Sequence, residues 1–494
     1  MTDTNRNQLI AWLPELLFVN GAFRSGSALV CNEAGTIAGI VSADELTNEK
    51  QINLSRRALL PGMTNAHSHA FQRVLRGRTE YRTTNQRDSF WTWREMMYSA
   101  ATRLSPEDVY DASRMAFLEM ALSGITAVGE FHYLHHAPDG QSYDDPNLLA
   151  KGVIRAANDV GLRIALLRVA YARSGFEVEV NPRQARFIES DPESYLKNLA
   201  SLISDLGGGE VSEGSLTGVA LPDGRASDTA WVGMAPHSVR AVPLDYLRAV
   251  IGYANQHDLK IHMHVAEQPA EVSACVEEYG RTPTALLESE GLLNPRFTAV
   301  HAIHVTPKAI ASLAQTGAMV CACPTTERNL GDGVVPANEY QRRGVSICLG
   351  TDSHAQIDLL EDARELEYHL RLQKLERAVL SPGSPDDALS DGEPAETARY
   401  LFACATINGA QSIGAPGGSL AAGKPADFFT VDLDDPSIAG ASPNDLLAGI
   451  VFTLSRGAVR EVVIGGKPIV SAGRHLIQED VVERFNDLQK KLWS

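Results

Sequence analysis

The sequence has little of three features that mark whole classes of protein: long apolar runs, cysteine and clustered basic residues. No uninterrupted run of 18 apolar residues occurs, and the opening MTDTNRNQLI has no apolar core, so we expect neither a membrane span nor a signal peptide. Six cysteines in 494 residues are too few for a disulfide framework. We interpret Cys321 and Cys323, in the apolar segment AMVCACPTT, as structural, and we expect a reducing, cytoplasmic location.

Negative charge is in excess. The 44 Lys and Arg residues and 61 Asp and Glu residues give a net charge of −17. Without a basic stripe or zinc-finger spacing, this composition argues against nucleic acid or an anionic membrane as a partner. It does not exclude an anionic small substrate, because a few arginines can make a site locally cationic inside an acidic protein.

Eight short apolar segments alternate with stretches of helical periodicity, such as the spacing of Leu359, Ala363, Leu366 and Leu370. The segments are rich in Val, Ile, Leu and Ala, as is typical of strands buried on both faces. This alternation predicts the α/β class and a (β/α)8 TIM-type barrel. The segments are RALLPGMTNAHSH, ITAVGEFHY, RIALLRVAY, WVGMAPHSV, KIHMHVAEQ, FTAVHAIHV, AMVCACPTT and VSICLGTDSH.

The two chain ends differ from the barrel segments, because their sequences predict short strands separated by turns. Asn20-Gly21 and Gly465-Gly466 are hairpin signals. We predict that the two ends form one small β-sandwich domain beside the barrel. The expected division is 1–58 plus 415–476 for this domain, 59–414 for the barrel and 477–494 for a C-terminal helix, with mobile surface loops at 206–228 and 381–396.

The predicted barrel strands carry polar side chains at their carboxyl ends, where the active site of such a barrel lies. His67 and His69 are two residues apart on a strand and therefore point the same way. Taken alone they could be two structural histidines. With His264 and Asp352 they make a ligand set of three nitrogens and one oxygen that suits catalytic Zn²⁺, although Fe²⁺ or another divalent ion would also fit. His262 points to the same face but could equally be a packing residue.

These positions resemble the amidohydrolase superfamily. The H-x-H after the first strand, the histidines of the fifth and sixth and the aspartate after the eighth match its pattern. Many members have a carboxylated lysine after the fourth strand, where this chain has APHSVR. The resemblance therefore implies the mononuclear, deaminase-like branch, in which Glu267 and His301 are catalytic and Asp352 is both ligand and base.

Further motifs resemble the formimidoylglutamate deiminase family within that superfamily: PGMTNAHSHAFQR, FWTWREMMY, EFHYLHHAPDG, APHSVRAV, HMHVAEQ, CPTTERNLGDG and GTDSHAQIDLLEDARELEYHLRL. The resemblance covers nearly the whole chain, although the 206–228 loop is longer than expected. It implies hydrolysis of N-formimino-L-glutamate to N-formyl-L-glutamate and ammonia in histidine degradation, and a homodimer. Glu267 would carry protons and His301 would stabilise the tetrahedral centre.

A substrate with two carboxylates needs local cations, and arginine suits planar carboxylates best. Arg94 and Arg240 are the candidates, with hydrogen bonds from Gln72, Tyr133 and His237. The family resemblance points to the same five residues. Arg94 could instead face water beside an aromatic anchor.

Two other functions remain open from the sequence. One is a deaminase of the same branch that acts on a nucleobase, triazine or guanidino compound, for which two pocket arginines are unnecessary. The other is a non-catalytic relative, although the ligand set is complete. Two of His132, His135 and His136 are expected to be structural or to support the ligands, and His304 and His354 to orient ligands rather than bind metal. Thr325, Thr326, Glu327 and Asn329 are expected in a loop that lines the pocket, with no role assigned.

Overall fold

The computed structural model of the chain describes residues 9–82, 89–176, 178, 181–207, 219–220, 226–227, 229–382 and 395–494. The loops predicted at 206–228 and 381–396 lie for the most part outside these residues, so their mobility stays a prediction. Within the described part, β9 (Val219–Ala220) and β10 (Ala226–Ser227) form a short antiparallel pair. None of the described helices is both long enough and apolar enough to cross a membrane.

Eight parallel strands form the barrel; seven lie within a predicted segment, and β11 begins one residue before its segment. The sheet order is β15-β14-β13-β12-β11-β8-β7-β6. A parallel bridge between Ser68 and Asp352 joins its first and last strands. Two backbone hydrogen bonds support this closure, from Asp352 N to the His67 carbonyl at 3.0 Å and from His69 N to the Asp352 carbonyl at 3.1 Å. The strands are β6 (Met63–Ser68), β7 (Ile125–His132), β8 (Arg163–Ala170), β11 (Ala230–Pro236), β12 (Ile261–Val265), β13 (Phe297–His301), β14 (Met319–Ala322) and β15 (Ile347–Leu349).

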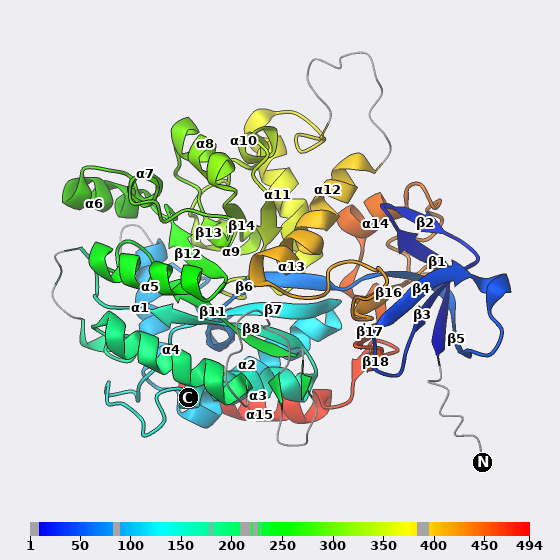
Figure 1. Cartoon of the computed structure of the whole chain (residues 1–494), viewed down its shortest axis with the longest axis horizontal. Coiled ribbons are helices and arrows are strands. Elements are labelled where there is room, and N and C mark those ends of the chain that lie inside the picture. Colours follow the sequence, from blue (N-terminus) through cyan, green and yellow to red (C-terminus); the bar gives the residue numbers. More distant parts are fainter. Residues whose placement is uncertain are drawn as a thin grey trace.

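Helices surround the barrel strands (Figure 1). Local signals set their ends: Ser105 caps α2 with Pro106 in its first turn, and α3 stops at Gly161 with a φ of 86°. The predicted apolar stripe of α11 is buried. The helices are α1 (Phe90–Ala101), α2 (Pro106–Leu122), α3 (Leu148–Val160), α4 (Pro192–Gly207), α5 (Leu244–Gln256), α6 (Pro269–Tyr279), α7 (Pro283–Ser289), α8 (Pro307–Thr316), α9 (Pro324–Leu330), α10 (Ala337–Arg342), α11 (Leu359–Lys374), α12 (Glu396–Ala405), α13 (Ile407–Ile413) and α14 (Leu446–Thr453).

The two chain ends pair beside the barrel, as predicted, which confirms the fold class. Their strands form one nine-stranded mixed sheet, a simpler arrangement than the expected two-sheet sandwich. The reason is β5, which pairs in parallel with β1 on one side and antiparallel with β16 on the other. The strands are β1 (Ile10–Val19), β2 (Ala22–Arg24), β3 (Ser27–Cys31), β4 (Ile37–Ser42), β5 (Lys50–Pro61), β16 (Phe428–Asp432), β17 (Val459–Ile464), β18 (Lys467–Ser471) and β19 (Arg474–His475).

Local geometry agrees with both hairpin predictions. Asn20 and Gly21 have φ values of 50° and 83°, and Gly465 and Gly466 have 55° and 70°, as a type I′ turn requires. The passage from the mixed sheet to the barrel lies at Gly62, where an added Cβ would be 2.3 Å from Thr126 Oγ1. Because β5 runs to Pro61, the sheet extends beyond the boundary expected at residue 58; the domain division itself stays a prediction.

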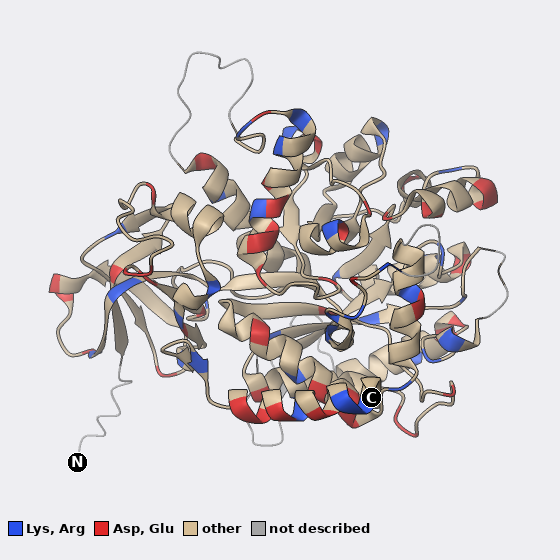
Figure 2. Cartoon of the chain, turned by 180° about the vertical axis from the view of Figure 1, so that it is seen from behind, with Lys and Arg blue, Asp and Glu red and all other residues tan. Residues whose placement is uncertain are grey.

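The predicted C-terminal helix is α15 (Gln478–Trp493), which packs on α2 with Phe485 and Leu488 buried. On the face seen in Figure 2, basic positions are interspersed with acidic ones along the outer helices. Arg484, for example, pairs with both Glu107 and Asp111. This outer cation therefore has carboxylate partners.

Candidate active site

Four predicted metal ligands converge at the carboxyl ends of three strands. His67 lies in β6 and His69 follows it, His264 lies in β12, and Asp352 follows β15. All four side chains are buried, and each offers a ligand atom within 4.8 Å of the others. A second such group consists of His301, Cys323 and Asp352.

The imidazoles are held with their Nε2 atoms facing one another. His67 Nε2 lies 3.2 Å from Nε2 of His69 and 3.2 Å from Nε2 of His264. His69 and His264 each donate from the other ring nitrogen to a backbone carbonyl. His69 Nδ1 donates to the Phe131 carbonyl at 3.0 Å, and His264 Nδ1 donates to the His237 carbonyl at 3.0 Å. Since one nitrogen of a neutral imidazole carries the proton, the Nε2 atoms of His69 and His264 present lone pairs.

This arrangement fits a metal ion. Ligands at 2.0–2.1 Å around a tetrahedral ion are separated by about 3.3 Å, close to the observed spacing. Burial lowers the pKa of His67 to about 3, so its ring is neutral at physiological pH. Burial opposes ionisation of Asp352, yet the neighbouring His67 and His69 rings hold its pKa well below the usual range. Neutral imidazoles and an ionised carboxylate are the protonation states that a divalent cation requires.

Two further predicted catalytic residues lie beside this cluster. His301 ends β13, and its Nε2 is 3.8 Å from Glu267 Oε1 and 3.7 Å from Asp352 Oδ2. Its Nδ1 is 3.2 Å from Glu327 Oε1. Burial raises the pKa of Glu267. Burial also disfavours the imidazolium, but the carboxylates of Glu267 and Glu327 raise the pKa of His301 to about 10.

The backbone is strained where these residues leave their strands. Positive φ values occur at Ala266 (52°), His301 (66°), Ala302 (49°), Asp352 (45°) and His354 (61°). Such conformations are unfavourable for residues other than glycine and persist when the surroundings enforce them, often at functional sites.

A buried polar network supports the H-x-H segment from behind. Ser68 Oγ donates to Glu130 Oε2 at 2.5 Å, and Ala70 N donates to Glu130 Oε1 at 2.7 Å. His354 lies 3.0 Å from Ser68 Oγ and 3.1 Å from Thr351 Oγ1, so it can orient the segment, as expected. Glu130 had no predicted role; its place at a strand end was the only signal.

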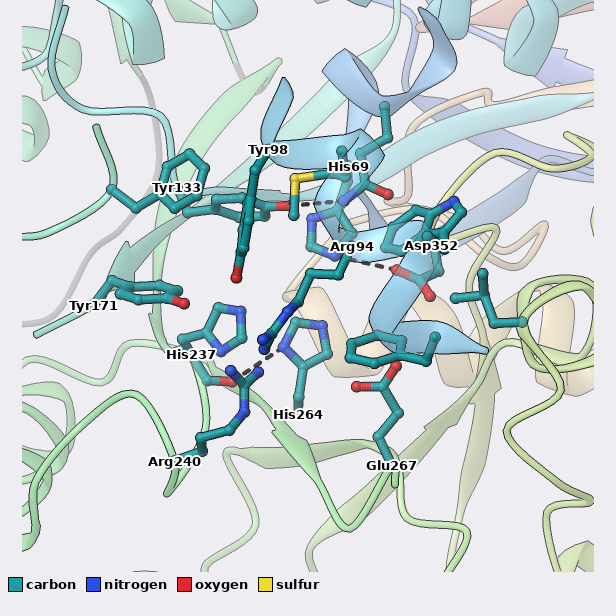
Figure 3. A pocket seen from close by; sticks show the side chains of 16 residues that line it. His69, Arg94, Tyr98, Tyr133, Tyr171, His237, Arg240, His264, Glu267 and Asp352 are labelled. Atoms are coloured by element: carbon teal, nitrogen blue, oxygen red, sulfur yellow. Dashed lines mark hydrogen bonds and ion pairs between the residues drawn. The ribbon is translucent and has the colours of Figure 1, made fainter. Parts of the chain in front are cut away.

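All five predicted substrate-binding residues line one cavity together with His69, His264, Glu267 and Asp352 (Figure 3). Seven lining residues were not predicted, although Arg94 and Tyr98 are four apart on α1 and so share one face. These seven are Phe90, Trp93, Met97, Tyr98, Tyr171, Phe187 and Leu330.

Both arginines face this cavity. Arg94 lies over the Trp91 ring at 4.4 Å and turns inward rather than to water. Arg240 follows β11 in a turn that brings it to the same wall as His237. Arg94 Nε and Arg240 Nη1 are buried and have no hydrogen-bond partner among the described residues. Unlike Arg484 of the outer helix α15, these guanidinium groups therefore retain donors for a ligand.

The remaining predicted polar residues are mostly structural. His135 and His136 bond to the carbonyls of Val169 and Ile188 at 2.8 and 2.9 Å. His304 bonds to the Asp332 carbonyl at 2.9 Å and does not join the His/Asp cluster. The segment after the seventh strand is the helix α9 rather than a loop, and only its Leu330 lines the cavity. Its Glu327 instead reaches His301.

Comparison with known proteins agrees with this geometry. A model of the amidohydrolase family matches residues 58–469. The chain is 38% identical to formimidoylglutamate deiminase of Pseudomonas aeruginosa, over 87% of this chain and 88% of that one. It is 28% identical to 8-oxoguanine deaminase of the same organism, over 90% of each chain.

Among solved structures, an amidohydrolase from Brucella melitensis superposes with a TM-score of 0.84 at 31% identity, covering 99% of this chain and 100% of that one. An adenosine deaminase from Xanthomonas campestris with bound zinc has a TM-score of 0.77 at 22% identity, covering 98% of each chain, and so shares the fold. The chain belongs to the amidohydrolase family, which is metal-dependent. It is a deaminase of this superfamily, a hydrolase that acts on carbon–nitrogen bonds.

Proposed function

We propose that the protein hydrolyses N-formimino-L-glutamate to N-formyl-L-glutamate and ammonia. One observation carries the proposal: Arg94 and Arg240 line the same cavity as the His/Asp cluster, with buried donors that lack partners among the described residues. Two guanidinium groups match a substrate with two carboxylates. The name of the Pseudomonas aeruginosa relative supports the same substrate.

His67, His69, His264 and Asp352 would hold one divalent ion in this proposal. Three nitrogens and one oxygen match Zn²⁺, and the set would also accept Fe²⁺. When bound, such an ion supplies Lewis-acid chemistry that makes water a nucleophile near neutral pH.

The chain's own carboxylates would then move the protons. Asp352 accepts the proton of the attacking water, for which its low pKa keeps it ionised. Glu267, in the carboxylate form, pairs with the cationic formimino group, then takes up the hydroxyl proton of the tetrahedral centre and delivers it to the departing nitrogen, while the carbonyl of the formyl group forms. The carbon–nitrogen bond breaks, and the nitrogen leaves as ammonia. Its raised pKa suits Glu267 to this exchange. His301 lies between the two carboxylates and stabilises the developing tetrahedral centre.

The rest of the cavity would position the substrate. Gln72 Nε2 donates to Tyr133 OH at 2.6 Å, and the phenol in turn donates to Met97 Sδ at 3.7 Å, a weak acceptor that a carboxylate would replace. His237 stands between Tyr171 and His264, with ring centroids 4.6 and 4.9 Å away. Gln72, Tyr133 and His237 thus add hydrogen bonds to the charge of Arg94 and Arg240.

The cellular setting belongs to the same proposal: a cytoplasmic homodimer that acts in histidine degradation, as the family resemblance implies. All six cysteines of the chain are buried free thiols, which suits a reducing compartment.

The test is ammonia release by protein loaded with Zn²⁺, assayed on N-formimino-L-glutamate, N-formimino-L-aspartate, guanine and cytosine. We expect rapid release from formiminoglutamate alone, loss of activity on chelation and recovery on adding Zn²⁺ back. Release from a nucleobase instead would overturn the substrate and the roles of both arginines. Activity that survives complete removal of metal would overturn the proposed ion site.

A further inference from the structure

Two tyrosines that the sequence did not single out lie on the cationic side of the cavity. Tyr98 comes from α1 and Tyr171 follows β8, and each is 2% exposed. Figure 3 shows their hydroxyl groups directed toward the side where the guanidinium groups of Arg94 and Arg240 lie. Both rings pack on Phe187, with centroids 5.8 Å away in each case. Their positions are therefore fixed by packing before any ligand arrives.

One buried amide joins the two hydroxyls. Gln184, in the short 3₁₀ helix Pro182–Gln184, donates from Nε2 to Tyr98 OH at 2.7 Å and to Tyr171 OH at 2.5 Å. An amide nitrogen has two N–H bonds, and here the two phenol oxygens receive them. Gln184 thus occupies the acceptor side of each hydroxyl, and even a hydrogen bond between the two phenols leaves at least one hydroxyl proton to be donated elsewhere.

Those protons lack a fixed acceptor in the described chain. No carboxylate or carbonyl of the described residues is hydrogen-bonded to either hydroxyl, and a contact between the two phenols would use at most one of the two protons. Burial raises the pKa of Tyr98, so it remains a donor at neutral pH. Two phenols and two guanidinium groups therefore bring donors to one region, where Glu267 and Glu271 lie near Arg240 but no carboxylate of the described residues is hydrogen-bonded to these four groups.

We propose that Tyr98 and Tyr171 bind the substrate carboxylate that lies farther from the His/Asp cluster, and that Gln184 is the positioning residue that aims both hydroxyls at it. The inference rests on the proposed function and deepens it. Tyr171 is separated from the cluster by the His237 ring, which stands between Tyr171 and His264. When the formimino carbon lies at the His/Asp cluster, the side-chain carboxylate of glutamate is the substrate group that can reach past His237 to the two tyrosines.

The test compares Tyr98→Phe, Tyr171→Phe and Gln184→Glu with the wild-type enzyme. Each phenylalanine variant should raise KM for N-formimino-L-glutamate about tenfold and change kcat less than about threefold, since a hydrogen bond to a charged group is lost. Gln184→Glu should raise KM further, because its carboxylate accepts the hydroxyl protons and repels the substrate. The conservative Tyr195→Phe is the control: this buried hydroxyl donates to the Arg168 carbonyl, away from the cavity, and KM should not change.

A second substrate locates the contact. N-formimino-L-norvaline lacks the side-chain carboxylate, so the tenfold effect of each phenylalanine variant on kcat/KM should fall below about twofold. An equal loss on both substrates, or KM values within twofold of wild type for both phenylalanine variants, would overturn the assignment.

Failure of the proposed function would be seen separately, as no ammonia release by the wild-type enzyme. Glutarate binding by calorimetry then tests the tyrosines by themselves. A Kd about tenfold weaker in each phenylalanine variant supports them. Equal binding by all variants, or no binding by the wild type, contradicts them.

Discussion

The mixed sheet and the barrel mouth bury their residues in opposite ways. The mixed sheet has an apolar core that includes Trp12, Leu29 and Phe428, and its buried Asp427 is paired with Arg163 at 2.7 Å. At the barrel mouth, charged and polar side chains converge, and Arg94 and Arg240 keep buried donors without partners in the described chain. Single unpartnered donors such as Trp12 Nε1 also occur in the mixed sheet, but of the two regions only the mouth, within the described residues, gathers unpartnered charged donors beside a cavity. Because an unsatisfied buried polar group costs about 1–3 kcal/mol, we infer that the mouth gives up stability for a ligand.

The two regions also differ in where their backbones adopt positive φ values. In the mixed sheet, positive φ falls mostly at hairpin turns occupied by Asn20, Gly21 and a glycine pair, which tolerate it, with Arg56 and Ala472 as exceptions. At the barrel mouth, positive φ falls on His301 and Asp352, whose side chains make this conformation unfavourable. Local preference therefore shapes the first region, and tertiary context overrides it in the second. This contrast predicts that changes at the mouth alter activity and changes in the mixed sheet alter stability.

The largest effect is expected for Glu267→Gln. Loss of the proton carrier should lower kcat about a thousandfold, within the usual range for general acid–base catalysis. The midpoint of thermal unfolding should stay the same or rise, because a buried carboxylate among Glu327 and Asp352 is neutralised. Steady-state ammonia release and calorimetry measure the two quantities. Glu277→Gln, on an exposed position of α6, is the control, and near-normal kcat in Glu267→Gln would refute the role.

The second largest effect is expected for Arg240→Met. It removes a guanidinium while keeping an unbranched side chain, and we expect kcat/KM for N-formimino-L-glutamate to fall about a hundredfold, as for other truncated charge pairs. Arg248→Met, which removes an exposed arginine of α5, should leave kcat/KM unchanged. Equal behaviour of the two variants would mean that the cavity does not bind carboxylates.

Phe428→Ala tests the other side of the comparison. Phe428 is fully buried and meets Trp12 edge to face with ring centroids 5.1 Å apart. Its truncation should lower the free energy of unfolding by about 3–5 kcal/mol and leave kcat at 25 °C within about twofold. Urea denaturation measures the loss, and Phe428→Leu should lose less. A large change in kcat would show that the mixed sheet is coupled to the site.

The smallest effect is expected for Asn20→Ala. With a φ of 50°, this exposed turn residue sits where alanine costs about 1 kcal/mol. Asn20→Gly should cost less than the alanine variant, because glycine adopts this conformation freely. Urea denaturation of the two variants measures the difference. Identical free energies of unfolding would show that the conformation of this turn does not contribute to stability.

Sequence patterns were sufficient for the elements and for the chemistry at the strand ends. Apolar runs predicted all eight barrel strands, and the Asn-Gly and Gly-Gly pairs predicted their hairpins. His67, His69, His264 and Asp352 could be grouped because parallel strands in a barrel bring their carboxyl ends together. These features depend on residue type and spacing along the chain, which are visible without coordinates.

Tertiary structure decided what depends on contacts between distant segments. Tyr98, Tyr171 and Gln184 lie on three elements with no shared spacing, and only packing around Phe187 brings them together. Likewise, no pattern shows that Arg94 turns inward, that Glu130 supports the H-x-H segment, or that β5 joins both ends into one sheet. The sequence by itself determined which groups meet at the mouth, because strand ends impose that meeting. Which of them retain free donors was settled by the folded surroundings, because hydrogen-bond partners come from anywhere in the chain.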